Sequence, residues 1–301
     1  MSFFSAKVFI PVLAAGLLLS GCSATPAQTP SETVAAGTDA AAAALLPSEY
    51  KTKGVNVGSE IPYAPMELFD SKGNPAGFEV DLANAIGEKL GTKFTFHTQA
   101  FDTVIASLQS GNHDVVMSSM SDTVDRQKVL DFVDYFQGGA SLIVPAGNPA
   151  KVTGLAALCG QSVTTESASW EIDVLASVSK TCTDAGKSAI KTVALPSDTD
   201  CQNALRAGKV AAYLSDSQAA AYTAKVAGDG KYFDLVVDPA APNGYESGLI
   251  GVGILKSNSK LTAAIQAAVA SLIKDGTYSA LLAKWNLSSF AVSAATINGT
   301  K

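Results

Sequence analysis

The sequence has few of the residues that usually hold metals, bind nucleic acid or span membranes. Its 301 residues include two histidines and four cysteines, with no CxxC pair and no histidine near a cysteine, so we predict no metal site. Lysine and arginine form no basic run and the formal net charge is −6, so nucleic acid is not an expected partner. No stretch reaches the roughly 18 consecutive apolar residues of a transmembrane helix.

Familiar catalytic motifs are also missing. The sequence contains neither HExxH nor GxSxG, and no nucleophile is paired with a base in a recognisable motif. We therefore predict that the protein is not an enzyme and needs no cofactor.

The first 22 residues have the pattern of an export signal. Lys7 precedes an apolar run over residues 8–19 that is too short to span a bilayer. The segment Leu19-Ser20-Gly21-Cys22 resembles a lipobox, in which the cysteine is lipidated and becomes the mature N-terminus. We predict a lipoprotein signal peptide over residues 1–22 and an extracytoplasmic protein that a lipid on Cys22 anchors to the membrane. A plain secretory signal with a chance cysteine is the alternative.

Residues 23–47 are mostly small or polar. Such a segment buries too little apolar surface to offset its ordering entropy, so we predict a flexible linker in which even the alanine run 40–44 has nothing to pack against.

The rest of the chain alternates between strand and helix patterns. Leu82, Ile86 and Leu90 lie four residues apart, with acidic residues in the first turn and Gly91 after the last, which predicts a helix over 78–90. Asp102 can cap another helix that ends at Gly111. Further predicted helices begin at Trp170, cover 197–207, and follow two apolar stripes after residue 260. Predicted strands cover 54–58, 93–98, 114–117, 162–165, 190–195 and 210–214.

This alternation favours an α/β fold of two lobes, each a mostly parallel sheet flanked by helices. We expect residues 48–140 and 249–301 in lobe 1 and residues 141–248 in lobe 2, joined by two crossing strands near 138–144 and 248–254. The tail after Leu287 either packs on lobe 1 or frays. Ligands of such folds bind at the carboxyl ends of strands, so a cleft between the lobes is the expected site.

The stretch 118–136 places hydroxyl groups and an arginine directly after a short apolar strand. A helical turn starting near Thr123 would aim Ser119, Ser121 and Arg126 at one spot, where free backbone N–H groups also favour an anion. A guanidinium can grip a carboxylate with two parallel hydrogen bonds. The alternative is an ordinary strand–helix junction with a surface arginine.

Beyond Cys22, three cysteines permit one disulfide and one free thiol in an exported protein. We favour Cys159–Cys182, with Cys201 buried on a helix, and Cys182–Cys201 is the alternative.

Several motifs in order resemble the family 3 extracellular solute-binding proteins, the polar amino-acid receptors of ABC importers. The segments that carry the resemblance are GFEVDL at 77–82, IPYAPME at 61–67, the stretch 118–136, YLSD at 213–216, and DGTY at 275–278 followed by Lys284-Trp285. The match runs from about residue 55 to 287 and implies the two-lobed periplasmic-binding-protein fold of type II.

The resemblance also implies roles for individual residues. Arg126 stands where the family binds the ligand α-carboxylate, with Ser119, Ser121 and the second-lobe Ser169 nearby. Asp216 stands where a second-lobe aspartate takes the α-ammonium group. Tyr63 and Phe101 stand where aromatic rings sandwich the ligand side chain, and Glu60 where an acidic group reaches its far end.

Alternatives exist for several of these residues. Asp216 could be a helix N-cap, Tyr63 and Phe101 could be core aromatics, and Glu60 could be a solvated surface carboxylate. The chain also departs from the family at Ala168-Ser169-Trp170, where a Gly-Thr pair is common, so Trp170 either adds a ring to the pocket or fills the lobe core. Ala211 replaces an aspartate of the family, a change we expect to be structural.

The resulting hypothesis is a monomeric, lipid-anchored receptor that binds a free polar amino acid and delivers it to an ABC permease. Arg126 and Asp216 on opposite lobes would pair with the two charges of a zwitterion, so that ligand stabilises closure about the hinge. The alternatives are a periplasmic dehydratase of the cyclohexadienyl or arogenate type, because fold alone does not fix function, and an amino-acid sensor for a membrane kinase.

Overall fold

A computed structural model describes residues 37–241 and 244–301. The predicted signal peptide, the predicted lipidation site Cys22 and the predicted linker up to residue 36 lie outside the described residues. Within the described ranges, no helix is long and apolar enough to cross a membrane.

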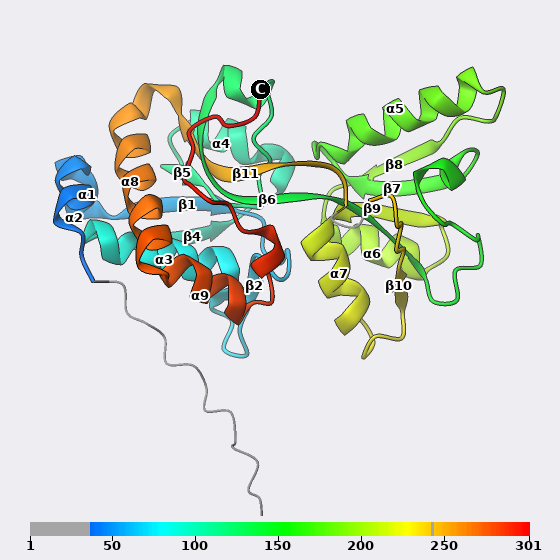
Figure 1. The fold of residues 1–301 in the computed structure, drawn as a ribbon, viewed down its shortest axis with the longest axis horizontal. Coiled ribbons are helices and arrows are strands. Elements are labelled where there is room, and N and C mark those ends of the chain that lie inside the picture. The colour runs from blue at the N-terminus through cyan, green and yellow to red at the C-terminus, as the bar shows by residue number, and fades with distance from the viewer. Residues whose placement is uncertain (1–36, 242–243) are drawn as a thin grey trace, which may run out of the picture. The chain divides into compact units, whose positions relative to one another are not determined.

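The described residues form one large sheet that combines two parallel strand sets (Figure 1). In the first set β1 pairs in parallel with β4 and β5, and in the second set β7 pairs in parallel with β8 and β9. The strands of these sets are β1 (Val55–Ser59), β4 (Phe94–Thr98), β5 (Val115–Val116), β7 (Ser162–Glu166), β8 (Lys191–Leu195) and β9 (Ala212–Asp216). The predicted α/β architecture with two mostly parallel sets is therefore confirmed.

Two long strands connect the sets. β6 (Leu130–Pro145) and β11 (Tyr245–Leu255) run antiparallel to each other in the middle of the sheet. β11 also pairs with β5 of the first set, and β6 pairs with β9 of the second. These are the two crossing strands that the sequence predicts. The short β10 (Phe233–Leu235) also pairs with β6, and a separate hairpin joins β2 (Leu68–Phe69) to β3 (Pro75–Ala76).

Helices cover the sheet (Figure 1). They are α1 (Ala40–Leu45), α2 (Ser48–Lys53), α3 (Phe78–Leu90), α4 (Val104–Gln109), α5 (Glu171–Asp184), α6 (Asp198–Arg206), α7 (Ser217–Val226), α8 (Ser259–Asp275) and α9 (Thr277–Lys284). The bounds of α3 match the prediction, because its apolar stripe is fully buried and Gly91 ends it in the left-handed conformation that glycine adopts readily.

Apolar side chains gather in separate clusters on the two sides of the crossing strands. The largest cluster draws on α1, α3, α8 and α9 around the first strand set and also includes Ala219 of α7, and a smaller one lies beneath α4. Two other clusters contain only residues between 140 and 245, around the second set.

The N-terminal helix α1 contradicts the linker prediction for residues 39–47. The Asp39 carboxylate caps α1 by accepting hydrogen bonds from the N–H groups of Ala41 and Ala42, and it accepts another from the hydroxyl of Ser271 on α8. Ala42 and Leu46 are buried in the largest cluster. The small alanine side chains let α1 approach α8 closely, which composition alone does not reveal.

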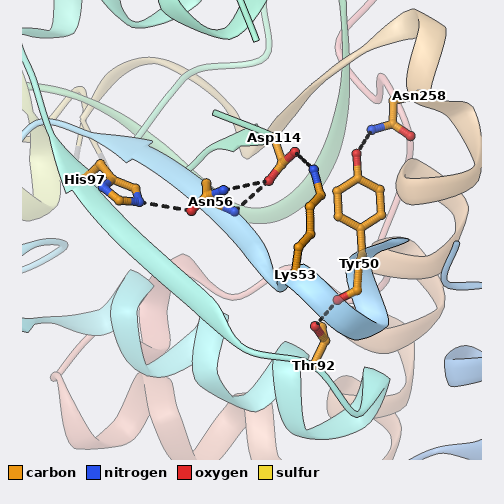
Figure 2. Close-up of polar contacts among 7 residues, drawn as sticks. All are labelled: Tyr50, Lys53, Asn56, Thr92, His97, Asp114 and Asn258. Carbon is orange, nitrogen blue, oxygen red and sulfur yellow. Dashed lines mark hydrogen bonds and ion pairs between the residues drawn. The ribbon is translucent and has the colours of Figure 1, made fainter. Parts of the chain in front are cut away.

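Polar contacts, shown in Figure 2, link the next helix, α2, to the first strand set. Lys53 forms an ion pair with Asp114, whose carboxylate also accepts hydrogen bonds from the backbone and side chain of Asn56. The Asn56 side chain in turn contacts His97 on β4. Within the described residues, α1 and α2 therefore precede the first predicted strand.

Two element boundaries differ from the sequence prediction. β9 covers 212–216 instead of 210–214, because β6 pairs with Tyr213 through Asp216, and this antiparallel partner is invisible in the local pattern. Asp102 does not cap α4. It lies inside a 3₁₀ turn, Phe101–Thr103, and the residue before α4 makes no side-chain capping bond.

The C-terminal tail packs along β6 and does not fray. Ile297 bridges to Val133, and the Asp134 carboxylate accepts hydrogen bonds from the Thr296 hydroxyl and the Gly299 N–H group.

We predict that Leu46→Ala lowers the free energy of unfolding by roughly 2–5 kcal/mol, the usual cost of truncating a buried leucine. The matched control is Leu45→Ala, because Leu45 is 48% exposed and Leu46 only 3%, and this change should stay within about 0.5 kcal/mol of the wild type. Urea unfolding measures both. Equal effects of the two substitutions would contradict the docking of α1.

Candidate functional site

A small cavity lies where the carboxyl ends of parallel strands from both sets meet, as the strand order predicts. Its first side comes from residues that follow β1 and β5 and from the turn before α4. Its second side comes from the end of β7, the start of α5 and the end of β9. The lining residues are Glu60, Tyr63, Phe101, Ser118, Ser119, Ser121, Glu166, Ser169, Trp170, Glu171 and Asp216.

The buried carboxylate of Asp216 accepts hydrogen bonds from both sides of this cavity. The Tyr63 hydroxyl donates to it over 3.0 Å and the Ser119 hydroxyl over 3.0 Å. The indole N–H of Trp170 donates over 3.2 Å. Asp216 does occupy the N-cap position of α7, but its side chain makes no capping bond. The Asp216 carboxylate therefore forms hydrogen bonds with cavity residues and does not cap α7.

Ser119 adopts a left-handed backbone conformation, with φ of +45°. Its N–H group donates to Glu79 over 2.8 Å, and its hydroxyl accepts a hydrogen bond from Gln218. Because few L-residues adopt this conformation without compensating contacts, these bonds hold the serine in place. Ser121 contributes its backbone carbonyl, which accepts from Arg126.

Arg126 lies beside the cavity and not in its lining. Its guanidinium donates to the carbonyl groups of Ser121 and Ala168, each over 2.9 Å, and stands 5.4 Å from the ring centroid of Phe101. The expected helical turn near Thr123 is a short 3₁₀ turn, Arg126–Lys128. In the described residues, no ion pair joins Arg126 to an acidic group. Its two N–H donors thus point at neutral acceptors between the two strand sets.

Among the described residues, four carboxyl groups face the cavity and no lysine or arginine lines it. Glu60, Glu166, Glu171 and Asp216 are each only 3–6% exposed, which contradicts a solvated surface position for Glu60. Burial raises the pKa of all four groups, and the neighbouring Glu60 helps to raise the pKa of Glu166 to about 12. Such a cavity attracts cations and repels anions.

The two aromatic residues differ in their surroundings. Tyr63 belongs to the largest apolar cluster and also presents its hydroxyl to Asp216, so it is both a core residue and a cavity residue. Phe101 is half-buried against the cluster beneath α4 and lies under Arg126.

The second side contains the departure from the family pattern. Trp170 reaches Asp216 through its indole N–H while its ring also packs on a cluster of the second set. The Ser169 hydroxyl contacts that of Thr165. Both residues line the cavity.

Three cavity residues escaped the sequence prediction. Ser118 accepts a hydrogen bond from the Glu60 N–H group over 2.9 Å. Glu166 ends β7, and Glu171 opens α5. An acidic residue in the first turn of a helix usually indicates only a favourable charge–dipole interaction, so the position of Glu171 gave no signal of a buried site. The position of Glu166, directly after a predicted strand, was a signal that could have identified it.

The structure joins Cys159 to Cys182 by a disulfide and leaves Cys201 free and buried on α6. Among the described residues, no group of three or more histidine, cysteine, aspartate or glutamate side chains is arranged to hold a metal ion.

Comparison with known proteins agrees with this geometry. The model of the bacterial extracellular solute-binding proteins, family 3, matches residues 55–288. The chain belongs to this family. The family prediction and the two-lobed fold are therefore confirmed.

Relatives of this solute-binding protein include amino-acid-binding proteins. It is 31% identical over 232 residues to the lysine/arginine/ornithine-binding periplasmic protein of Escherichia coli strain K12, covering 77% of this chain and 86% of that protein. A solved ancestral arginine-binding protein bound to arginine is 31% identical with a TM-score of 0.67, covering 77% of this chain and 97% of the other. The ancestral amino acid-binding protein AncCDT-1, described as a precursor of cyclohexadienyl dehydratase, is 26% identical with a TM-score of 0.68, covering 79% and 97%.

We predict that Glu166→Gln stabilises the ligand-free protein at pH 8. The pKa of Glu166 rises from its ordinary 4.5 to about 12 on folding, so the folded chain keeps a proton that the unfolded chain releases. Its contribution to stability is full below about pH 4.5 and is lost as the pH rises towards 12. Glutamine has no such dependence, so its advantage in urea unfolding should grow from pH 5 to pH 8.

Glu49→Gln, on the exposed face of α2, is the control for removing a carboxylate and should change little at either pH. An advantage of Glu166→Gln that shrinks as the pH rises would show that Glu166 is not protonated in the folded chain.

Proposed function

We propose that this protein is an extracytoplasmic receptor that binds a free polar amino acid in the cavity and delivers it to an ABC importer without chemical change. The observation that carries the proposal is the cavity itself, with the acidic Asp216 held on one side and the guanidinium of Arg126 at its edge. A zwitterion needs one anionic and one cationic partner when it is buried.

The ligand backbone would bind between these two groups. Its α-ammonium group would bind to Asp216, with Glu171 nearby, and its α-carboxylate would bind to Arg126. The two N–H groups that now donate to the carbonyls of Ser121 and Ala168 can instead form the paired hydrogen bonds that guanidinium makes with carboxylate. Ser119, Ser121 and Ser169 would supply further polar contacts.

The other acidic pair favours a cationic ligand side chain. Glu60 and Glu166 face the same cavity, and no cationic side chain of the described residues lines it. A lysine-like or arginine-like group placed there would favour the ionised form of both carboxyl groups. Tyr63, Phe101 and Trp170 would add aromatic contacts to a cation. The names of the relatives support this choice, since the E. coli protein is named for lysine, arginine and ornithine.

Binding would couple to a hinge. We propose lobe 1 as residues 39–140 and 249–301 and lobe 2 as residues 141–248, which moves the start of lobe 1 from residue 48 to include α1. The separate apolar clusters around the two strand sets support this division. A ligand that contacts both lobes stabilises the closed form only by its differential affinity for it.

The proposed location is the outer side of the cell membrane, with the protein exported by residues 1–22, anchored through a lipid on Cys22 and acting as a monomer. The lipobox-like segment before Cys22 supports the anchor.

A second candidate is a dehydratase. The similarity to AncCDT-1 favours it specifically, because that protein is described as a precursor of an enzyme. Assay of prephenate and arogenate turnover distinguishes the two functions, whereas a sensor for a membrane kinase would share the ligand and differ only in its partner.

We predict that a basic amino acid stabilises the chain lacking residues 1–22 in a thermal-shift screen of the 20 amino acids, prephenate and arogenate. A ligand at about 100 times its dissociation constant adds roughly 2.7 kcal/mol. Citrulline and norleucine, which match arginine and lysine in shape without the side-chain charge, are the ligand controls.

Arg126→Ala should abolish the shift and Arg126→Lys should weaken it, since lysine cannot make the paired hydrogen bonds. A shift that survives Arg126→Ala would remove this residue from the site. Equal shifts with arginine and citrulline would contradict the cation preference.

We also predict that Cys22→Ser abolishes incorporation of labelled fatty acid into the full-length protein in a bacterial host, because the lipid would have no attachment point. A variant that still incorporates the label would contradict lipid anchoring at Cys22.

A further inference from the structure

A second acidic pair contacts the cavity residue Ser119 and has no place in the ligand contacts described above. Glu67 precedes β2, and Glu79 is the second residue of α3. Both side chains are completely buried. Acidic residues are almost never buried this fully unless a partner compensates for the loss of water.

The hydrogen bonds of the two residues are unequal. One oxygen of Glu79 accepts from the Ser119 N–H group over 2.8 Å and from the Tyr135 hydroxyl. The other oxygen of Glu79 and both oxygens of Glu67 accept no hydrogen bond from the described residues. The two carboxyl groups are close enough for each to shift the pKa of the other. A proton between them would give these oxygens the partners that buried polar atoms need.

The charges around the pair require such a proton. The ionisable groups that face it are Tyr135 from β6, Asp216 at the end of β9 and Glu60 after β1, and all of them are acidic. Burial raises the pKa of both glutamates, and for Glu67 the neighbouring Glu79 adds to the effect. Two adjacent buried carboxyl groups cannot both ionise without a cation.

The pair is connected to Ser119 and Tyr63, the two residues on the first side of the cavity that donate hydrogen bonds to Asp216. Glu79 holds the N–H group of Ser119, whose hydroxyl donates to Asp216. The backbone carbonyl of Glu67 accepts from the Tyr63 N–H group over 2.7 Å, and the Tyr63 hydroxyl also donates to Asp216. The left-handed conformation of Ser119 makes its N–H contact with Glu79 essential for aiming the hydroxyl.

We propose that Glu67 and Glu79 are a positioning pair that holds one proton on Glu67 and one negative charge on Glu79. Glu79 is the ionised member because it already accepts two hydrogen bonds, whereas Glu67 has no donor other than its own proton. The charge fixes Ser119 and adds to the negative potential at Asp216 that draws the ligand α-ammonium group. The effect on binding rests on the proposed amino-acid function, but the position of the proton does not.

Glu67→Gln tests where the proton lies. A glutamine amide has the shape of a protonated glutamate and can donate to Glu79, so the variant should bind the amino acid found in the screen within about twofold of the wild type. The infrared carbonyl stretch of a protonated carboxylic acid is separate from that of a carboxylate. The difference spectrum of the ligand-free full chain against Glu67→Gln should therefore show one protonated carboxyl group lost.

The double variant Glu67→Gln/Glu79→Gln tests the charge. It keeps the side-chain shapes and an amide oxygen for Ser119 but removes the remaining negative charge, so affinity measured by calorimetry should fall on the order of tenfold relative to Glu67→Gln. Glu49→Gln on the surface of α2 controls for the change in net charge. Melting temperatures of all variants separate loss of binding from loss of folding.

The outcomes are distinct. Glu67→Gln binding as weakly as the double variant, or a difference spectrum without a lost protonated carboxyl group, would overturn the assignment of the proton. A double variant that binds like Glu67→Gln would overturn the role of the charge. If the wild type binds no amino acid, the proposed function fails, and the infrared comparison still decides the state of Glu67.

Discussion

The carboxylate of Asp216 is buried and, among the described residues, forms no ion pair with a cation. The arrangement of the cavity follows from that constraint. Neutral donors from three separate segments, Tyr63, Ser119 and Trp170, compensate for its lost hydration. Two of them belong to segments that follow strands of the first set, while Asp216 itself ends β9 of the second. The same carboxylate thus links the two strand sets through hydrogen bonds.

Part of the site could be predicted because its residues follow a strand. Ser119 lies just past an apolar run, and in a parallel sheet such positions converge at one edge. The role of Asp216 was predicted only from the resemblance to the family. The orientation of Arg126 could not be predicted, since its two acceptors are backbone carbonyls that any residue supplies. Glu166 and Glu171 were missed because a carboxylate in a sequence normally indicates solvent exposure, and only tertiary packing buries these two.

In the fold, too, elements set by local sequence signals were predicted well, and elements set by distant contacts were not. α3 was predicted to the residue, because its apolar spacing, acidic first turn and Gly91 are all local signals. β9 was misplaced by two residues because its limits depend on pairing with β6, some seventy residues earlier in the chain. α1 was missed because its stability depends on α8, more than two hundred residues later, whose Ser271 bonds to Asp39.

The second strand set lies between two parts of the first set along the chain, and this arrangement decides which apolar core can form first. Two apolar clusters use only residues between 140 and 245, whereas the largest needs residues from Ala42 to Leu287. A chain that is made N-terminus first can therefore complete the second-set core while β1 and α3 still lack α8 and α9. Until those helices arrive, the apolar face of α3 is an exposed surface of the kind that chaperones bind.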